Sequence, residues 1–294
     1  MKIGAKLPHT GDAAISLGVT TLARRLEASG FDSLWVSDHI IFPKVIGSRY
    51  PFAPDGKANW PTDMPYIEAL TALAAAAAVT ERIQLGTAAL VLPLRNPVLL
   101  AKQAASIDVL SGGRLHLGLG AGWLREEFDA LDSAFDTRGP RMVEWIDLLR
   151  DCWTGHPAGR STAHYALPDD TVMLPKPEHG IPLYVGGHSP IALRRAGQLG
   201  DGWLAQQSVA SLDPGQLAKE IATVRSAAAK ANRDPDALRV VLRLVDSTGR
   251  SDVVADRLAE LDAAGVDEII VDTDYRNGDP KAECDLLRAA AASK

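Results

Sequence analysis

A glycine-rich segment, GLGAGW at residues 118–123, has residue types that suit contact between the backbone and a phosphate group. Glycine carries no side chain, so a ligand can approach the main chain closely at such positions. The segment does not fit the dinucleotide fingerprint G-x-G-x-x-G, because its third glycine comes one residue early and Trp123 follows where close helix packing favours a small side chain. Its chemistry therefore depends on the elements around it.

A second glycine pair stands before an expected helix in VGGHSP, residues 185–190. Gly186 and Gly187 end an apolar run, Ser189 is placed as the N-cap of the helix, and its first residue is a proline. The free N–H groups and the positive dipole end of such a helix favour a phosphate group. The glycines of GLGAGW would then hold the same phosphate from the other side. An ordinary capped helix with a tight turn explains this pattern equally well.

His39 follows another apolar run, in the segment WVSDHIIF. An imidazole at the end of a strand suits proton transfer near neutral pH. Asp38 is a neighbour that could orient the ring, but adjacent strand residues point to opposite faces, so a direct pair is not assured. A structural role for His39 is the alternative that this pattern leaves open.

The remaining reactive side chains favour structural roles. The acids of REEFDAL, residues 125–131, lie near the positive end of an expected helix, and we interpret them as structural. The other histidines show no metal-ligand spacing, and no G-x-S-x-G elbow is present, so neither a metal site nor serine-hydrolase chemistry is expected. Cys152 and Cys284 form no C-x-x-C motif and are expected to be buried or idle thiols.

Two kinds of periodicity define the elements that must position these residues. Short apolar runs typical of strands recur at residues 3–7, 34–37, 83–92, 115–119, 183–187, 202–205, 239–245 and 268–271. Most intervening segments have the i, i+3, i+4 spacing of amphipathic helices, as in residues 18–30, 141–153 and 251–265. Eight buried strands alternating with helices favour an α/β fold of the (β/α)8 TIM-barrel type, although an open parallel sheet gives a similar rhythm. In a barrel, both glycine segments and His39 would converge on one mouth.

Two proline-rich stretches, residues 40–65 and 155–182, lack helical periodicity and are expected to be long loops. Insertions of this length usually have a functional role, so both are expected to lie over the C-terminal mouth of the barrel. No shift in composition marks a boundary, and residues 1–294 are expected to form a single domain.

The composition argues against several classes of partner. The net charge is -6 with 23% charged residues and no basic run, so nucleic-acid binding is not expected. The N-terminus lacks the apolar core of a signal peptide, and the alanine-rich stretch at residues 69–79 is too short to cross a bilayer. A cytoplasmic location without a membrane partner is therefore expected.

Several long segments together resemble a known family. They are SDHIIFP, then AAAAAVTERIQLGTAALVLPLRNPVLLAKQAASIDVLSGGRLHLGLGAGWLREEFDAL, then RGPRMVEWIDLLRDCWTG, and then GIPLYVGGHSPIALRRAGQLGDGW. In this order and spacing they resemble the luciferase-like monooxygenase family, and within it the branch of oxidoreductases that depend on the deazaflavin coenzyme F420. The resemblance covers nearly the whole chain.

This resemblance implies a (β/α)8 barrel that holds a flavin or deazaflavin at its mouth. It implies a catalytic role for His39 as the proton-transfer residue, and a non-prolyl cis peptide between Ala88 and Ala89 that backs the cofactor ring. The cofactor-binding residues expected on this basis are Asp38, Ala88, Ala89, Ala121, Gly122, Trp123, Gly186, Gly187, His188 and Ser189. No metal is expected among them.

The expected substrate depends on Trp123. In the sugar-phosphate dehydrogenase of this family a glutamate that aids catalysis occupies the matching position, and no matching set of lysines and arginines is found here, which argues against a sugar phosphate. The first long loop adds Phe42, Tyr50, Phe52 and Trp60. These aromatic side chains favour a small, largely apolar organic substrate, unless they serve only to pack the loop.

The expected function is hydride transfer between C5 of coenzyme F420 and such a substrate, with His39 moving the proton. One alternative is an FMN-dependent two-component monooxygenase, because FMN offers one phosphate to the same glycines. Another is a non-catalytic flavin- or deazaflavin-binding protein. The F420 tail needs a partly basic groove, and Arg125, Arg194 and Arg195 are candidates to line it. Alternatively, these arginines are ordinary solvated surface residues. Relatives commonly pair through barrel helices, so a homodimer is expected.

Overall fold

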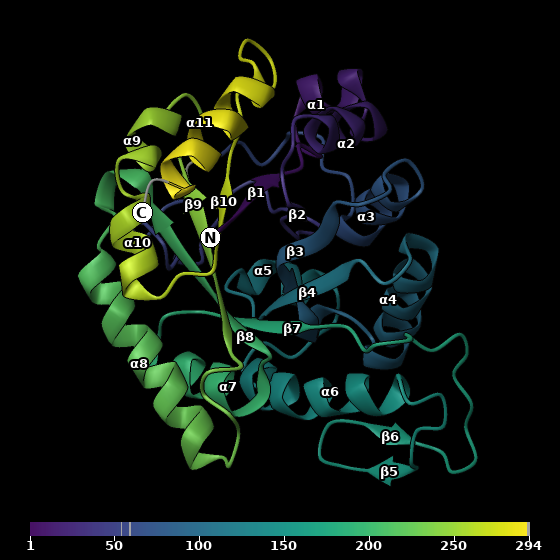
Figure 1. The fold of residues 1–294 in the computed structure, drawn as a ribbon. Coiled ribbons are helices and arrows are strands. Elements are labelled where there is room, and N and C mark those ends of the chain that lie inside the picture. Colours follow the sequence, from purple (N-terminus) through teal and green to yellow (C-terminus); the bar gives the residue numbers. More distant parts are fainter. Residues whose placement is uncertain (54, 59, 293–294) are drawn as a thin grey trace.

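All eight apolar runs expected to be strands form one closed parallel barrel, in the order β1-β10-β9-β8-β7-β4-β3-β2 (Figure 1). This computed structural model describes residues 1–53, 55–58 and 60–292. The barrel strands are β1 (Lys2–Lys6), β2 (Ser33–Val36), β3 (Gln84–Val91), β4 (Leu115–Gly120), β7 (Leu183–Gly186), β8 (Gly202–Ser208), β9 (Arg239–Val245) and β10 (Glu268–Val271). The predicted (β/α)8 barrel is confirmed.

Helices form the outer layer around these strands (Figure 1). They are α1 (Asp12–Leu17), α2 (Val19–Ala28), α3 (Ala69–Ala77), α4 (Pro97–Ser111), α5 (Arg125–Ala130), α6 (Arg138–Cys152), α7 (Pro190–Leu199), α8 (Pro214–Lys230), α9 (Ser251–Ala255), α10 (Leu258–Ala264) and α11 (Pro280–Ala292). Short 3-10 turns follow β3 at Leu92–Leu94 and β8 at Val209–Ser211.

The helix expected over residues 251–265 is divided into α9 and α10. The break occurs where the N–H of Arg257 bonds the carbonyl of Val254, three residues back instead of four. Both pieces still bury one apolar face, which includes Val254, Leu258 and Leu261.

The strands have apolar residues on both faces because each face is buried against a different layer. In β9, Val240 and Leu242 point outward into the core shared with the helices, whereas Val241 points into the barrel. In β10, Ile269 points outward toward the helices and Ile270 points into the barrel. The periodicity of two is therefore hidden in the sequence, since both faces of each strand require apolar side chains.

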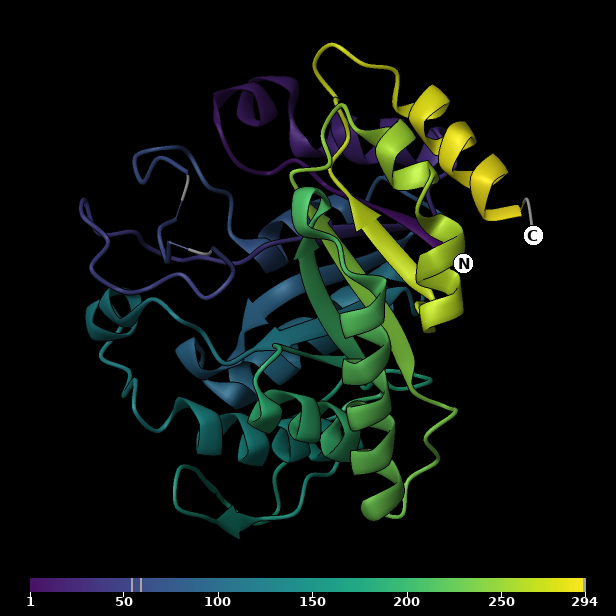
Figure 2. The same cartoon turned by 90° about the vertical axis from the view of Figure 1, so that its left-hand side faces the viewer.

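The two long loops lie in different places. The first, residues 40–65, follows β2 and lies beside α5, at the end of the barrel toward which β3 points (Figure 2). Residues 54 and 59 of this loop are outside the described residues. Its backbone is tied to α5 where the N–H groups of Gly47 and Ser48 donate to Glu126 Oε1 at 2.6 and 3.0 Å.

The second long loop, residues 155–182, contacts outer helices instead of the mouth. It includes a small hairpin of β5 (Arg160–Ser161) and β6 (Ala166–Leu167), which lies below α6 in Figure 1. Lys102 of α4 donates to the carbonyl of Leu174, and Thr162 donates to Glu144 of α6. Only the first loop is therefore positioned over the mouth, because the second joins a helix to the next strand and so leaves from the opposite end of the barrel.

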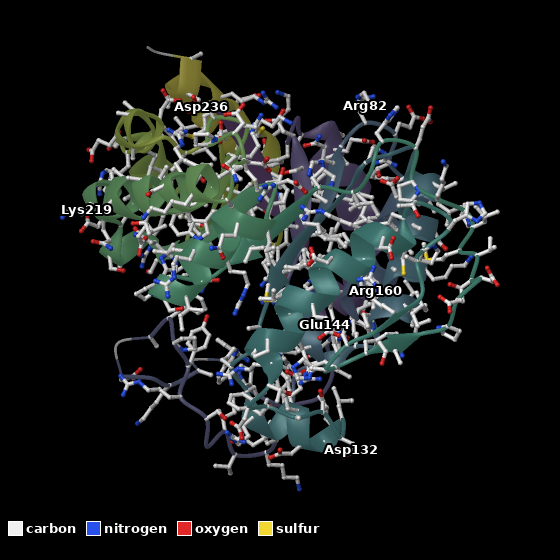
Figure 3. All side chains as sticks on the ribbon, turned by 90° about the horizontal axis from the view of Figure 1, so that it is seen from below. Arg82, Asp132, Glu144, Arg160, Lys219 and Asp236 are labelled. Carbon is white, nitrogen blue, oxygen red and sulfur yellow. The ribbon has the colours of Figure 1, made fainter. Side chains whose placement is uncertain are left out.

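The surface carries charged side chains of both signs, among them Arg82, Asp132, Glu144, Arg160, Lys219 and Asp236 (Figure 3). Cys152 and Cys284 are buried free thiols, as expected. Within the described part of the chain, no helix combines the length and apolar character that a membrane span requires.

Candidate active site at the carboxyl ends of the strands

An apolar plug fills the middle of the barrel. It consists of the inward-facing, buried side chains Trp35, Tyr184, Leu204, Val241 and Ile270. Two residues further along each strand, the next inward-facing position lies one layer closer to the mouth. Most residues of this upper layer are half-buried, in contrast to the plug, so solvent reaches them. The upper layer is the part of the barrel interior that a ligand can contact.

One half of the upper layer is built from small residues. Ala88 and Ala89 of β3 pack on the plug, and Gly120 and Gly186 come from β4 and β7. The peptide between Ala88 and Ala89 is cis, as the resemblance implied, and the β3–β4 register shifts there. These small side chains leave room directly above the plug on this side of the barrel.

The two glycine turns follow β4 and β7, which pair with each other. Gly122 has φ +85°, and a Cβ atom on it would lie 2.7 Å from both Phe128 and Val91. Gly187 has φ +117°, and a Cβ atom on it would lie 2.9 Å from Ala192. Both positions therefore require glycine, for backbone conformation and for space.

The start of α7 has the predicted cap. The side chain of Ser189 accepts a hydrogen bond from the N–H of Ala192 at 3.2 Å, and Pro190 is the first helical residue. The N–H groups of His188, Ser189 and Ile191 donate to no residue that the structure describes. Three backbone donors thus remain available beside the turn at Gly187.

The ring of His188 is held inside the protein. Its Nε2 accepts a hydrogen bond from the N–H of Gln206 at 3.0 Å, which places the proton on Nδ1, where Glu220 Oε2 accepts it at 3.0 Å. Trp203 packs against the ring in an edge-on geometry at 5.3 Å. The side chain of His188 therefore fixes the turn, while its backbone N–H has no hydrogen-bond partner among the described residues.

His39 pairs with a carboxylate that the sequence analysis interpreted as structural. Its Nδ1 lies 3.1 Å from Oε2 of Glu127, a buried residue in the first turn of α5. Oε1 of the same carboxylate accepts the N–H of Ile40 at 2.5 Å. Glu127 thus orients the imidazole and anchors the chain that follows it. Nε2 of His39 has no hydrogen-bond partner among the described residues and is the nitrogen available for proton exchange.

Asp38 does not contact His39, because the two side chains leave the backbone in different directions. Its carboxylate accepts a hydrogen bond from the N–H of Val91 at 2.8 Å and forms a bidentate ion pair with Arg95 at 2.6 and 2.8 Å. Arg95 also bonds Glu68 at 2.9 Å. Asp38 therefore joins the end of β2 to the end of β3, and any effect on a cofactor acts through the position of β3.

Aromatic rings surround the imidazole of His39. The ring centroids of Phe42, Trp60, Tyr66 and Trp123 lie 4.5, 6.3, 6.1 and 6.0 Å from it. Tyr50 links this shell together, with its ring 5.0 Å from both Trp60 and Trp123. The loop aromatics thus pack on one another and also form an apolar wall around His39.

The other half of the upper layer is polar. Lys6 ends β1, and Gln206, Arg243 and Asp272 come two residues after the plug residues Leu204, Val241 and Ile270. Arg243 donates to Asp272 Oδ1 at 2.5 Å. Gln206 and Asp272 directly follow their apolar runs and were expected at the mouth without a role, whereas sequence reasoning missed Lys6 and Arg243, because each lies within a run that is apolar on both faces.

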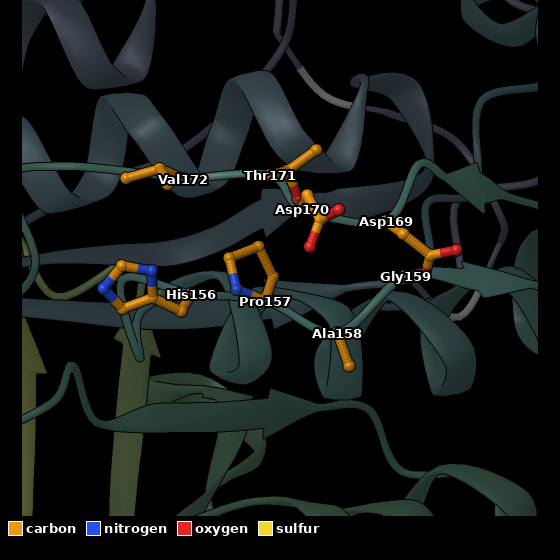
Figure 4. Close-up of a pocket in the computed structure, with 8 residues that line it drawn as sticks. All are labelled: His156, Pro157, Ala158, Gly159, Asp169, Asp170, Thr171 and Val172. Carbon is orange, nitrogen blue, oxygen red and sulfur yellow. The ribbon is translucent and has the colours of Figure 1, made fainter.

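A surface pocket elsewhere does not include any predicted site residue. It is formed by the second long loop and lined by His156, Pro157, Ala158, Gly159, Asp169, Asp170, Thr171 and Val172 (Figure 4). Within the described ranges, no group of histidine, cysteine, aspartate and glutamate side chains is placed to hold a metal ion.

Comparison with known proteins agrees with the fold and places this (β/α)8 barrel in a family. The model of the luciferase-like monooxygenase family matches residues 1–287. An uncharacterised protein of Mycobacterium tuberculosis is 35% identical over 250 residues, which cover 85% of this chain and 83% of that protein. The chain belongs to the luciferase-like monooxygenase family, which confirms the resemblance seen in the sequence.

Relatives with a stated activity are similar over a shorter length. The F420-dependent glucose-6-phosphate dehydrogenase of Amycolatopsis mediterranei is 32% identical over 186 residues, 62% of this chain and 51% of that enzyme.

Solved structures share the barrel over nearly the whole chain. An F420-dependent secondary alcohol dehydrogenase in complex with an F420–acetone adduct superposes with a TM-score of 0.80 at 18% identity, covering 98% of both chains. A monooxygenase from Streptomyces bottropensis gives a TM-score of 0.70 at 20% identity, covering 99% of this chain and 98% of the other.

Proposed function

We propose that this protein is an oxidoreductase that transfers a hydride between coenzyme F420 and a small organic substrate. The observation that carries the proposal is the juxtaposition of two glycine turns, on paired strands, with a histidine oriented by a buried carboxylate. The turns suit a phosphate, and the histidine suits a proton that accompanies the hydride.

The residues present fit the phosphate of a flavin or deazaflavin. Gly122 and Gly187 allow close approach, and the N–H groups of His188, Ser189 and Ile191 would donate to phosphate oxygens at the positive end of α7. Cations also lie near the turns. Arg138 donates to the carbonyl of Gly122 at 3.2 Å and has no carboxylate partner among the described residues.

The arginines expected to line a groove for the cofactor tail differ from one another. Arg125 is paired with Asp136 at 2.7 Å, so its charge is balanced. Arg195 has no ion pair with any described residue and lies 3.3 Å from the Cβ position of Gly139 at the start of α6. Arg194 is exposed. Arg195 and Arg138 are therefore better suited than Arg125 to pair with the anionic tail of F420, because neither has a carboxylate partner among the described residues.

The cofactor, when bound, supplies a ring carbon that exchanges hydride with the substrate. In our proposal, Ala88 and Ala89 give the ring a flat apolar backing, and Asp38 holds the strand that carries them. His39 moves the proton through Nε2, Glu127 keeps the imidazole in position, and the aromatic wall around His39 excludes water. This wall also supports a substrate with a largely apolar body.

Coenzyme F420 is favoured over FMN by the named relatives. The enzyme of Amycolatopsis mediterranei and the alcohol dehydrogenase of the same fold both depend on F420. FMN-type monooxygenase chemistry is the second candidate, because a monooxygenase shares the barrel and because both cofactors offer one phosphate to the same turns.

The first experiment is equilibrium binding of F420 and of FMN, each followed by quenching of its own fluorescence. We expect F420 to bind at least about tenfold more tightly than FMN, which corresponds to about 1.4 kcal/mol. Tighter binding of FMN would instead support the monooxygenase. Binding of neither cofactor would contradict the assignment of the glycine turns. Turnover with secondary alcohols and ketones then separates an enzyme from a non-catalytic binding protein.

The positioning role of Glu127 is tested with Glu127→Gln. The amide can still accept the N–H of Ile40 through its oxygen, but its remaining group is a donor and cannot accept from His39 Nδ1. We expect the turnover number to fall about tenfold or more, part of the roughly 100- to 10,000-fold that a positioned proton-transfer group contributes, with F420 affinity unchanged. His39→Gln should lower turnover at least as much. An unchanged turnover number in both variants would remove His39 from the reaction.

The homodimer is also part of the proposal. Leu99, Val109 and Leu110 of α4 are exposed apolar residues on the outer layer, the kind of surface that a second copy would cover. Light scattering at micromolar concentration tests this, and a monomeric mass would contradict it.

A further inference from the structure

The polar half of the upper layer is a defined group of side chains, not a scatter of surface charges. Its four members come from the consecutive barrel strands β1, β10, β9 and β8. A Cβ atom on Gly4 would lie 3.1 Å from Trp35 Nε1 inside the barrel, so Lys6, two residues on, also faces inward. Gln206, Arg243 and Asp272 face inward by the same spacing from the plug.

The charges in this group do not balance. Arg243, which is only 7% exposed, forms an ion pair with Asp272. Although burial alone would raise its pKa, Arg243 and Lys6 hold the pKa of Asp272 below its usual value, so this carboxyl is ionised. One carboxylate therefore faces two cations.

Lys6 is the cation left over. Its side chain is half-buried, and its Nζ neither donates a hydrogen bond to nor forms an ion pair with any residue in ranges 1–53, 55–58 and 60–292. Burial lowers the pKa of Lys6, and Asp272 offsets part of this effect. A partly desolvated ammonium without a partner is unfavourable, so a ligand that brings negative charge to it would relieve an existing cost.

Gln206 of β8 extends the polar group from Arg243 toward the aromatic wall. Gln206 is paired in register with Arg243, and its Nε2 donates to the hydroxyl of Tyr50 at 3.2 Å. Tyr50 belongs to the aromatic wall, with its ring 5.0 Å from Trp123. The polar group and the aromatic wall are therefore adjacent, and a molecule that contacts both would have an apolar body and one charged end.

We propose that the substrate of this enzyme is an organic carboxylate, with its apolar body against the aromatic wall and its carboxylate bound by Lys6 next to the Arg243–Asp272 pair. This inference rests on the proposed function and narrows its substrate to small organic acids. It also refines the sequence-based expectation of a small, largely apolar organic substrate by adding one charged end.

The test uses benzoate and benzamide as probes, because they have nearly the same shape and differ in charge. Their binding to the F420-loaded protein is measured by calorimetry for the native chain, Lys6→Met, Lys6→Arg and Lys230→Met. Lys230 is an exposed lysine at the far end of α8 and serves as the matched control. We expect the native chain and Lys230→Met to bind benzoate at least about tenfold more tightly than benzamide, as charged hydrogen bonds allow.

Lys6→Met should remove this preference by weakening benzoate binding alone, and Lys6→Arg should restore part of it. Equal binding of the two probes to the native chain, or no binding of benzoate, would overturn the inference. A preference that survives Lys6→Met would overturn it as well. F420 binding is measured for every variant. If F420 fails to bind to the native chain, the proposed function fails, whereas normal F420 binding without a benzoate preference contradicts the carboxylate inference alone.

Discussion

The two halves of the barrel mouth are built from opposite kinds of residue. On β3, β4 and β7 the upper layer consists of alanine and glycine, and the turns beyond it offer backbone N–H groups. On β8, β9, β10 and β1 the same layer consists of long polar and charged side chains. The first half suits a large group held by its shape and its phosphate, and the second suits a small group held by its charge. The difference lies in a single layer of side chains above the same apolar plug.

The largest effect is expected when a charge is placed in the small-residue half. In Gly187→Asp, the new side chain meets Ala192 and the carboxylate stands where the phosphate is proposed to bind. We expect a loss of F420 affinity of about 100-fold or more, because shape and charge both oppose binding. Fluorescence quenching measures this loss.

Gly180→Asp is the matched control for that variant. Gly180 also has a positive φ, of +76°, but no atom lies within 4 Å of its Cβ position. The two variants share a positive φ and the added charge, and differ in the space around the new side chain. If both lowered F420 affinity equally, the phosphate site would not be at Gly187.

A smaller effect is expected when charge is removed from the polar half. Asp272→Asn leaves Arg243 and Lys6 without a carboxylate, and we expect the free energy of unfolding to fall by about 2–3 kcal/mol, somewhat less than for a fully buried pair. Urea denaturation gives the value. Adding Lys6→Met should recover part of it, because only one of the two cations then remains uncompensated.

An exposed ion pair is the control for this experiment. Lys281 and Asp285 lie 2.6 Å apart on the surface of α11. Asp285→Asn should leave the free energy of unfolding nearly unchanged, because water screens an exposed ion pair. A similar cost at both sites would mean that the polar half of the mouth is as well solvated as the outer surface.

The smallest effect concerns the opposite end of the barrel, where His116 lies in β4 below the plug. Burial, with Lys2 and Arg239 nearby, lowers the pKa of His116 to about 4. In the unfolded chain the group titrates near 6.5, so the unfolded state binds the extra proton between about pH 6.5 and pH 4, and stability is lost as the pH falls through that window.

Between pH 6.5 and pH 4, the unfolding free energy of His116→Gln should therefore fall by about 1–2 kcal/mol less than that of the native chain. Urea denaturation at a series of pH values measures this. His156→Gln, at an exposed position, should leave the slope unchanged. Identical slopes in the native chain and His116→Gln would show that His116 does not contribute.

Much of the barrel could be predicted from the sequence, because its signals are local. The eight apolar runs, the glycine turns and the Ser189 cap each occupy a few consecutive residues, and all of them are found as expected. The family resemblance added the cis peptide at Ala88 and Ala89, which no periodicity indicates.

The pairs that organise the candidate site could not be predicted, because each joins distant segments. Glu127 is 88 residues from His39 in the chain. Its place in the first turn of a helix, where an acid is favoured by the helix dipole, already explained its presence. Asp38 pairs with Arg95, 57 residues away, instead of with its neighbour. Arg243 is hidden in a run whose two faces are both apolar, so alternation could not show that its side chain enters the barrel.

Adjacent glutamates in the first turn of α5 have a further consequence. Glu126 holds the long loop through Gly47 and Ser48, and Glu127 holds His39. One short helix therefore holds both the loop over the mouth and the histidine proposed to move the proton. A displacement of this turn would therefore move the loop and the imidazole together, which couples access to the mouth with the orientation of His39.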